Sequence, residues 1–70
     1  MKEMNYKLHE RLRDLRVDHG LTQEDLAKIC GVDHVDICRW EAKMHIPTVS
    51  SILAIAEYFD VSIDYLVGRK

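Results

Sequence analysis

The sequence predicts an all-α fold, a compact bundle of five short helices around one core. Apolar residues recur at helical spacing in separate segments, and capping residues and glycines mark the ends of those segments. No segment shows the alternation of apolar and polar residues that is typical of a strand. Because 47% of the 70 residues are apolar, the chain can build one small core, and we expect a single domain over residues 1–70.

The first helix is expected at about residues 6–18. Leu8, Leu12 and Leu15 recur at steps of four and three, which places them on one apolar face of a helix. Gly20 ends this helix, because glycine adopts the left-handed backbone conformation of a helix end without a steric cost.

The second helix is expected at about residues 23–30, directly after a capping signal. The hydroxyl of Thr22 followed three residues later by the carboxylate of Asp25 is the pattern of a capping box. Apolar residues then follow at helical spacing: Leu26, Ala27, Ile29 and Cys30.

The third helix is expected at about residues 34–42, where the same signal is repeated. Asp33 has the position of an N-cap, and Asp36 has the spacing of a capping-box acid. The connection to the second helix is only about three residues long and contains Gly31. This spacing predicts a helix-turn-helix unit at about residues 22–42, the most specific signal in the chain.

Two further helices are expected at about residues 49–59 and 63–67. Pro47 marks the loop before the first of them, because the residue preceding a proline is biased away from helix. Thr48 and Ser62 are the expected N-caps. The apolar positions of the longer helix are Val49, Ile52, Leu53, Ala56 and Phe59.

The overall charge does not by itself indicate a nucleic-acid partner. Ten Lys and Arg residues against twelve Asp and Glu residues give a net charge of −2. Residues 17–41 carry six carboxylates against two cations, whereas the tail at residues 68–70 is basic and is expected to fray.

Several classes of protein are excluded by the composition. Two cysteines are too few for a disulfide framework, and no stretch approaches the roughly 20 apolar residues of a membrane-spanning helix. We therefore expect a cytoplasmic protein without a membrane partner. Five short helices leave little room for a pocket that holds a nucleophile beside a base, so an enzyme, a cofactor and a small-molecule ligand are not expected.

Three runs of residues carry a family resemblance. They are, in order, Thr22-Gln23-Glu24-Asp25-Leu26-Ala27, Gly31-Val32 and Ile37-Cys38-Arg39-Trp40-Glu41. With Pro47 and the run from Leu53 to Gly68, these motifs span about residues 6–68. The chain resembles the helix-turn-helix family of phage repressors and Cro proteins, the xenobiotic-response-element type. The resemblance implies a sequence-specific transcriptional repressor that binds a palindromic DNA operator as a homodimer.

The resemblance also implies roles for individual residues. In this family the third helix lies in the major groove, and the start of the second helix contacts a phosphate. The base-reading positions are occupied here by His34, Val35 and Arg39. Arg39 can bind guanine O6 and N7 together, Val35 can contact the thymine methyl group, and His34 can make one hydrogen bond. The positions that face or contact phosphates are Gln23, Thr22, Asp36, Lys43 and Arg13.

Two further roles, an ion pair and a dimer surface, concern stability and assembly. Arg16 and Glu41 occupy the positions of a structural ion pair that is common in the family. The last short helix cannot bury all of its apolar side chains in a monomer, which favours a two-fold dimer surface there. The residues expected at this surface are Tyr65, Val67 and Ile63, with Tyr58 nearby.

Two acidic residues depart from the family pattern. Members often carry Ser at the position of Asp33 and Ser or Thr at that of Asp36. These carboxylates favour the start of a helix, but they repel phosphates. The run at residues 42–45 also lacks the Asn-Gly and the second strong cation of many members. An alternative function is therefore a protein-interaction module on the same fold, an anti-repressor or antitoxin-like partner with weakened DNA binding.

Two cysteines and a histidine have the residue types of a metal site. Cys30, His34 and Cys38 are of zinc-ligand type and lie four residues apart. The turn at Gly31 separates the first from the other two, and no clear fourth ligand follows, although His45 could reach. We expect no metal, with Cys30 at a small core position and Cys38 at the surface. A thiol or metal sensor is a third alternative.

Overall fold

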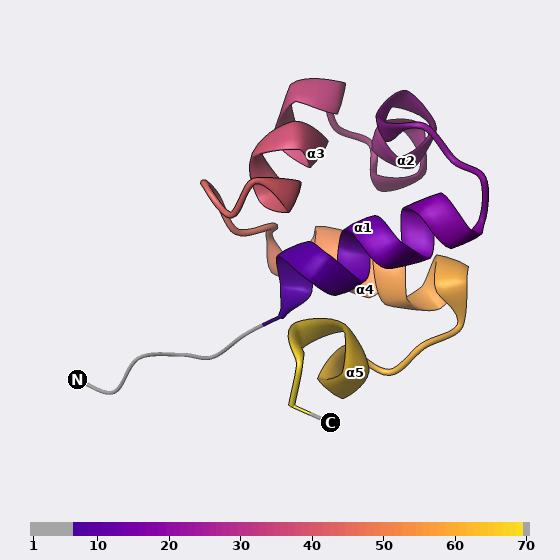
Figure 1. The fold of residues 1–70 in the computed structure, drawn as a ribbon, viewed down its shortest axis with the longest axis vertical. Helices are drawn as coiled ribbons and strands as arrows, with labels where there is room; N and C mark the ends of the chain where they lie inside the picture. The colour runs from indigo at the N-terminus through magenta and orange to yellow at the C-terminus, as the bar shows by residue number, and fades with distance from the viewer. Residues whose placement is uncertain (1–6, 70) are drawn as a thin grey trace.

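The computed structural model describes residues 7–69, and these form five α-helices joined by short loops (Figure 1). In chain order the helices are α1 (Leu8–Asp18), α2 (Gln23–Cys30), α3 (His34–Glu41), α4 (Val49–Phe59) and α5 (Ile63–Val67). No strand occurs within residues 7–69, and the all-α prediction is confirmed. The expected start of the first helix at about residue 6, and Lys70 of the basic tail, lie outside the described residues.

Three helices begin at the predicted caps. The Thr22 hydroxyl accepts a hydrogen bond from the Asp25 backbone N–H at 3.0 Å, and the Thr22 N–H donates to the Asp25 carboxylate at 2.9 Å. Thr48 accepts from the backbone N–H of Ser51 at 3.2 Å, and Ser62 accepts from that of the residue three positions later at 3.0 Å. These side chains satisfy backbone donors that have no partner within the helix.

The capping box predicted for α3 is not formed. Asp33 occupies the N-cap position with an extended backbone, but its side chain makes no capping hydrogen bond. The backbone N–H of Asp36 donates instead to the carbonyl oxygen of Asp33 at 3.0 Å, which satisfies the donor that a capping side chain would take. The Asp33 carboxylate is therefore left exposed to solvent.

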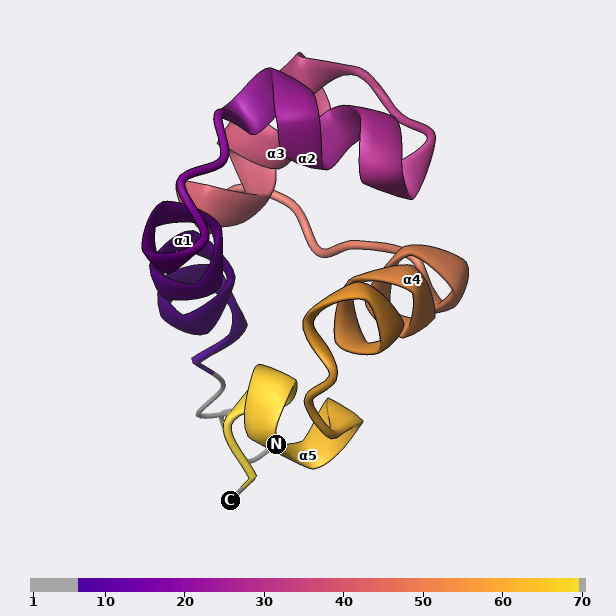
Figure 2. The same cartoon turned by 90° about the vertical axis from the view of Figure 1, so that its right-hand side faces the viewer.

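The helices surround the core as a ring. α2 packs against α3, α3 against α1, α1 against α5, α5 against α4, and α4 against α2. The side view in Figure 2 shows the α2–α3 pair at one end of the molecule and α5 at the other. The helix-turn-helix pair therefore has one long side free of other helices, and this side is the candidate site.

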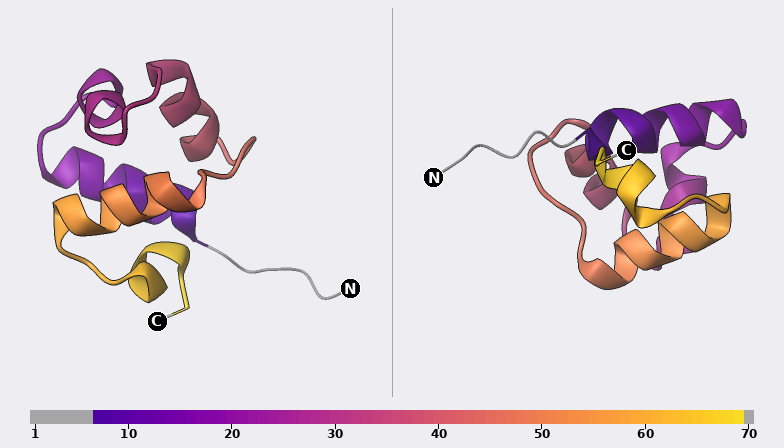
Figure 3. Two further views of the ribbon diagram at one scale, coloured as in Figure 1. Left: turned by 180° about the vertical axis from the view of Figure 1, so that it is seen from behind. Right: turned by 90° about the horizontal axis from the view of Figure 1, so that it is seen from below.

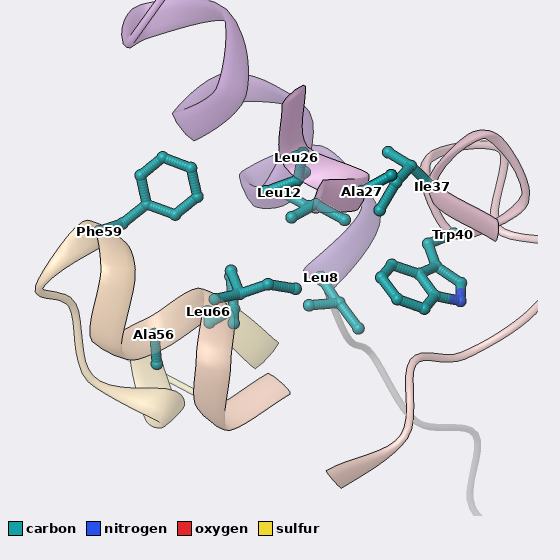
Figure 4. Packing of buried hydrophobic residues seen from close by; sticks show 10 residues of the cluster. Leu8, Leu12, Leu26, Ala27, Ile37, Trp40, Ala56, Phe59 and Leu66 are labelled. Carbon is teal, nitrogen blue, oxygen red and sulfur yellow. The ribbon is translucent and has the colours of Figure 1, made fainter. Parts of the chain in front are cut away.

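Each helix contributes one completely buried side chain to the core. These side chains, each 0% exposed, are Leu12, Leu26, Ile37, Ile55 and Leu66, from α1 to α5 in order. Trp40 and Phe59 extend the cluster at 7% exposure each (Figure 4). Because every helix supplies a core residue, the orientation of α3 depends on all of the others.

The predicted apolar face of α4 was wrong in part. Val49 is 74% exposed and Leu53 is 50% exposed, whereas Ser51 is 5% exposed and faces the core. Most residues of α4 are apolar or small, so periodicity does not select one face. The buried side runs instead through Ser51, Ile55 and Phe59 at steps of four. Ser51 tolerates burial because the Thr48 hydroxyl donates a hydrogen bond to its oxygen at 3.1 Å.

Candidate nucleic-acid interface

The outer face of α3 presents a row of side chains to solvent. Ile37 and Trp40 point inward and are buried, which anchors the helix. The opposite side is exposed and carries His34, Val35 and Arg39, the three predicted base-reading residues. Cys38 is exposed on the same helix. A helix that is anchored on one face and polar on the other can enter a groove without unfolding any part of the domain.

The turn between α2 and α3 is set by a glycine at the helix end. Gly31 has a φ of 72°, in the left-handed region. The backbone N–H of Val32 donates to the carbonyl oxygen of Ala27 at 2.9 Å, a bond typical of the Schellman motif. Val32 then packs against the core, which fixes the direction in which the chain enters α3.

A polar network fixes the far end of α3. The Arg16 guanidinium donates two hydrogen bonds to the Glu41 carboxylate, at 2.7 Å and 3.1 Å. It donates a third to the carbonyl oxygen of Leu21 at 2.9 Å, and the Gln23 amide donates to Glu41 at 3.2 Å. The side chains of Arg16 and Glu41 are only 15% and 6% exposed. One carboxylate thus joins the end of α1, the start of α2 and the end of α3.

The start of α2 contains two of the predicted phosphate-facing residues. Gln23 is half-buried and uses one amide hydrogen for Glu41, so the second hydrogen is available to a ligand. Thr22 is engaged with Asp25 in the capping box. Hydrogen bonds from the backbone N–H of Thr22, and then from its hydroxyl, lower the pKa of Asp25 below the ordinary value of 3.8.

Exposed or half-buried charges of both signs occur on α1, on α3 and its N-cap, and in the loop after α3. Arg13 on α1, Arg39 on α3 and Lys43 in the following loop are exposed cations. Lys43 has a φ of 65°, a left-handed conformation that is unusual for a residue with a side chain. Among the acids, Asp33 is exposed and Asp36 is half-buried. The surface is therefore mixed rather than uniformly basic.

The cysteines lie in different surroundings. Cys30 is partly buried beside the core, and this burial raises the pKa of its thiol. Cys38 is exposed on α3. Within residues 7–69, no group of three or more His, Cys, Asp or Glu side chains is placed to hold a metal ion. Among the same residues, no helix has both the length and the apolar character needed to cross a membrane.

The three residues predicted at a dimer surface differ in exposure. Ile63 is 41% exposed, whereas the Tyr65 ring, 37% exposed, is covered on one face by the Arg11 guanidinium, 4.4 Å from the ring centre. Val67 is half-buried. Leu53, which the sequence did not lead us to expect near these residues, borders a shallow groove of about 560 Å³ together with Ile63. The signal that could have found it is the spacing of Val49, Leu53 and the charged Glu57 at steps of four, which gives α4 an outward face.

Comparison with known proteins agrees with this geometry. The helix-turn-helix family profile matches residues 12–66, and the chain belongs to this family. It therefore carries a helix-turn-helix domain of the type found in DNA-binding transcription regulators.

Individual relatives are regulators of several kinds. The chain is 37% identical over 59 residues to the transcriptional regulator YobD of Bacillus subtilis, covering 84% of this chain and 53% of the relative. It is 36% identical over 64 residues to the transcriptional activator BcrR of Enterococcus faecalis, covering 91% of this chain and 31% of the relative. The chain thus spans about half or less of these relatives' length.

A solved repressor has nearly the same fold. The P22 c2 repressor, crystallised in complex with a synthetic operator, superposes with a TM-score of 0.83 at 32% identity. The alignment covers 90% of this chain and 96% of that one. The likeness therefore extends over almost all of the repressor chain in that structure.

Proposed function

We propose that the protein is a transcriptional repressor that reads an operator with α3 in the major groove of DNA. The observation that carries the proposal is the outward row of His34, Val35 and Arg39 on a helix anchored by buried Ile37 and Trp40. Arg39 is the main base contact, because a guanidinium can bind guanine O6 and N7 with two hydrogen bonds. The P22 c2 repressor, which is similar in fold, is solved with an operator.

The phosphate contacts come from the residues around this helix. Gln23 retains one amide hydrogen for a phosphate, while its bond to Glu41 holds it in position. Lys43 and Arg13 supply exposed cations. Thr22 contributes by setting the start of α2, since its donors already serve Asp25.

The binding unit is a homodimer on a palindromic operator. Two copies of one α3 would read two half-sites about 34 Å apart, one turn of the DNA helix. The surface we assign to the contact is the apolar pair Leu53 and Ile63, together with Tyr65 and Val67 of the same helix as Ile63. A two-fold contact uses the same patch on both subunits, so a single exposed patch is sufficient.

Repression follows from occupancy of the operator, with neither catalysis nor a cofactor required, and it takes place in the cytoplasm. The carboxylates of Asp33 and Asp36 lie at the start of the reading helix and oppose nearby phosphates. Affinity is therefore modest.

Selection from randomised duplex DNA at low salt tests the proposal. We expect enrichment of a palindrome, and the distance between its halves gives the half-site spacing. Arg39→Ala should then weaken operator binding by about 1–3 kcal/mol while the circular dichroism spectrum stays helical. Arg69→Ala, which removes an exposed arginine after α5, is the matched control and should have little effect.

Absence of enrichment from folded protein would contradict DNA reading. It would favour the protein-interaction module. The observation that supports this module is the Asp33 carboxylate, which makes no capping hydrogen bond and is exposed to solvent.

A further inference from the structure

A second concave site lies beside α3, away from the base-reading row. It lies between the start of α1, the end of α3 and the loop that follows α3, and its volume is about 250 Å³. Figure 3 shows from behind that this loop runs on the same side of the molecule as the start of α1. The residues that line the groove are Leu8, His9, Trp40, Lys43, Met44, His45 and Ile46.

The floor of the groove is apolar and its rim is exposed. Leu8 and Trp40 form the floor at 5% and 7% exposure, and Figure 4 shows the Trp40 ring turned toward Leu8. Met44 and Ile46 stand at the rim with 70% and 62% of their surface exposed. Large apolar side chains that remain this accessible beside a preformed cavity are typical of a binding surface.

The charge of the lining is one-sided. Its polar members are Lys43, His9 and His45, and no carboxylate of residues 7–69 lines the groove, although acids outnumber cations in the chain. The Glu10 carboxylate lies 3.9 Å from the His9 ring and is exposed to solvent on α1. The groove therefore complements an apolar group that is accompanied by negative charge.

The rim is held in place by the backbone. The N–H of Met44 donates to the carbonyl oxygen of Arg39 at 2.8 Å, and the N–H of Lys43 donates to that of Trp40 at 3.2 Å. Lys43 itself is in the left-handed conformation, which turns the chain away from α3. A rim that is already ordered loses little conformational entropy when a partner binds.

The size of the groove decides between two kinds of ligand. Small-molecule sites generally enclose about 300–1,000 Å³, more than this groove offers. One large apolar side chain of a peptide fits the available volume. We propose that the groove is a docking site for an acidic segment of a partner protein, which inserts one bulky apolar side chain between Trp40 and Ile46 and places its carboxylates near Lys43.

The chain contains its own reporter for this proposal. Trp40 is the only tryptophan, so its fluorescence reports directly on the groove. The full chain is titrated with the capped peptide acetyl-Asp-Glu-Phe-Asp-Glu-amide, which has no tryptophan. We expect a saturable change in Trp40 fluorescence. A peptide with Ala in place of Phe, and one with Lys in place of the acids, should each bind at least about tenfold more weakly.

Variants of exposed residues locate the site without unfolding the domain. Ile46→Ser and Lys43→Gln should each weaken binding of the acidic peptide by about fivefold or more. Val17→Ser is the matched control, because Val17 is 59% exposed on α1 and does not line the groove. It should leave binding unchanged.

Three results would overturn the proposal. The first is no saturable fluorescence change, and the second is equal binding of all three peptides. The third is that Ile46→Ser changes the oligomeric state in analytical ultracentrifugation but leaves peptide binding unaltered. That result would assign the groove to a second copy of this chain.

Discussion

Replacement of Glu41 by alanine should destabilise the domain strongly without touching the reading face of α3. Glu41 accepts two hydrogen bonds from Arg16 and one from Gln23. Within residues 7–69, removal of the carboxylate leaves the Arg16 guanidinium with one hydrogen-bond partner, the carbonyl oxygen of Leu21. The variant therefore combines a lost ion pair with a poorly solvated cation.

The burial of the pair sets the size of the effect. Exposed ion pairs contribute about 0.2–1 kcal/mol, whereas the loss of one partner of a buried pair costs about 3–5 kcal/mol. Glu41 is 6% exposed and Arg16 is 15% exposed, so the pair belongs near the lower end of the buried class. We expect Glu41→Ala to lower the free energy of unfolding by about 3 kcal/mol. In a domain of this size, that loss corresponds to a decrease of about 12–24 °C in Tm.

Urea denaturation followed by Trp40 fluorescence and by circular dichroism measures this loss. Glu41→Gln keeps a hydrogen-bond acceptor but not the charge, so it should lower the free energy of unfolding by about half as much as Glu41→Ala. The double variant Arg16→Met with Glu41→Leu should recover most of the stability, because it leaves no unpaired charge. Glu10→Ala, at an exposed position of α1, should stay within about 0.5 kcal/mol of the parent chain. A loss below about 1 kcal/mol for Glu41→Ala would refute the reasoning, since the pair would then behave as solvated.

Three further changes test the surface and the caps. Asp36→Ser should tighten operator binding by about twofold to fivefold and steepen the salt dependence of binding. Fluorescence anisotropy of labelled operator at several salt concentrations measures both effects. A weaker complex would show that Asp36 assists recognition. Lys43→Gly should raise the free energy of unfolding by about 1 kcal/mol, because glycine adopts the left-handed conformation without strain. The same change should weaken DNA binding and reduce the slope of log affinity against log salt concentration by about one. Unchanged binding would exclude a phosphate contact of Lys43. Thr22→Ala should cost about 1 kcal/mol near neutral pH. Because the pKa of Asp25 is lowered in the folded state, its carboxylate contributes to the free energy of unfolding above pH 3.8, and this contribution is lost as the pH falls through the lowered pKa. The free energy of unfolding of Thr22→Ala should therefore depend less on pH in this range. An unchanged pH dependence would show that the Thr22–Asp25 hydrogen bonds do not stabilise the fold.

Local chemistry accounts for most of what could be predicted about the helices. Thr22, Thr48 and Ser62 cap helices where the sequence places them, because a hydroxyl bonds to a backbone donor only two or three residues away. Gly31 closes α2 for an equally local reason, its freedom to adopt a positive φ. The exception is Asp33, where a backbone carbonyl satisfies the donor that the side chain was expected to satisfy.

Part of the candidate site could be predicted from the sequence, and part depends on the packing of the helices. The exposed row on α3 follows from the spacing of Ile37 and Trp40, since anchoring one side of a helix determines which residues face outward. The hydrogen bond between Gln23 and Glu41 could not be predicted from local spacing, because the two residues are 18 positions apart in the chain and meet only when the helices pack. Resemblance to the family indicated a role for each residue, but it did not indicate that one carboxylate serves both partners.

The helix-turn-helix spacing and the hydroxyl caps of α2, α4 and α5 are short-range properties that the order of residues determines alone. The burial of Ser51 in place of Val49, the exposed pair Leu53 and Ile63, and the groove behind Trp40 depend on how five helices share one small core. Several helix faces have similar apolar character, so sequence periodicity does not determine which of them is buried. The close packing of the five helices in one core determines it.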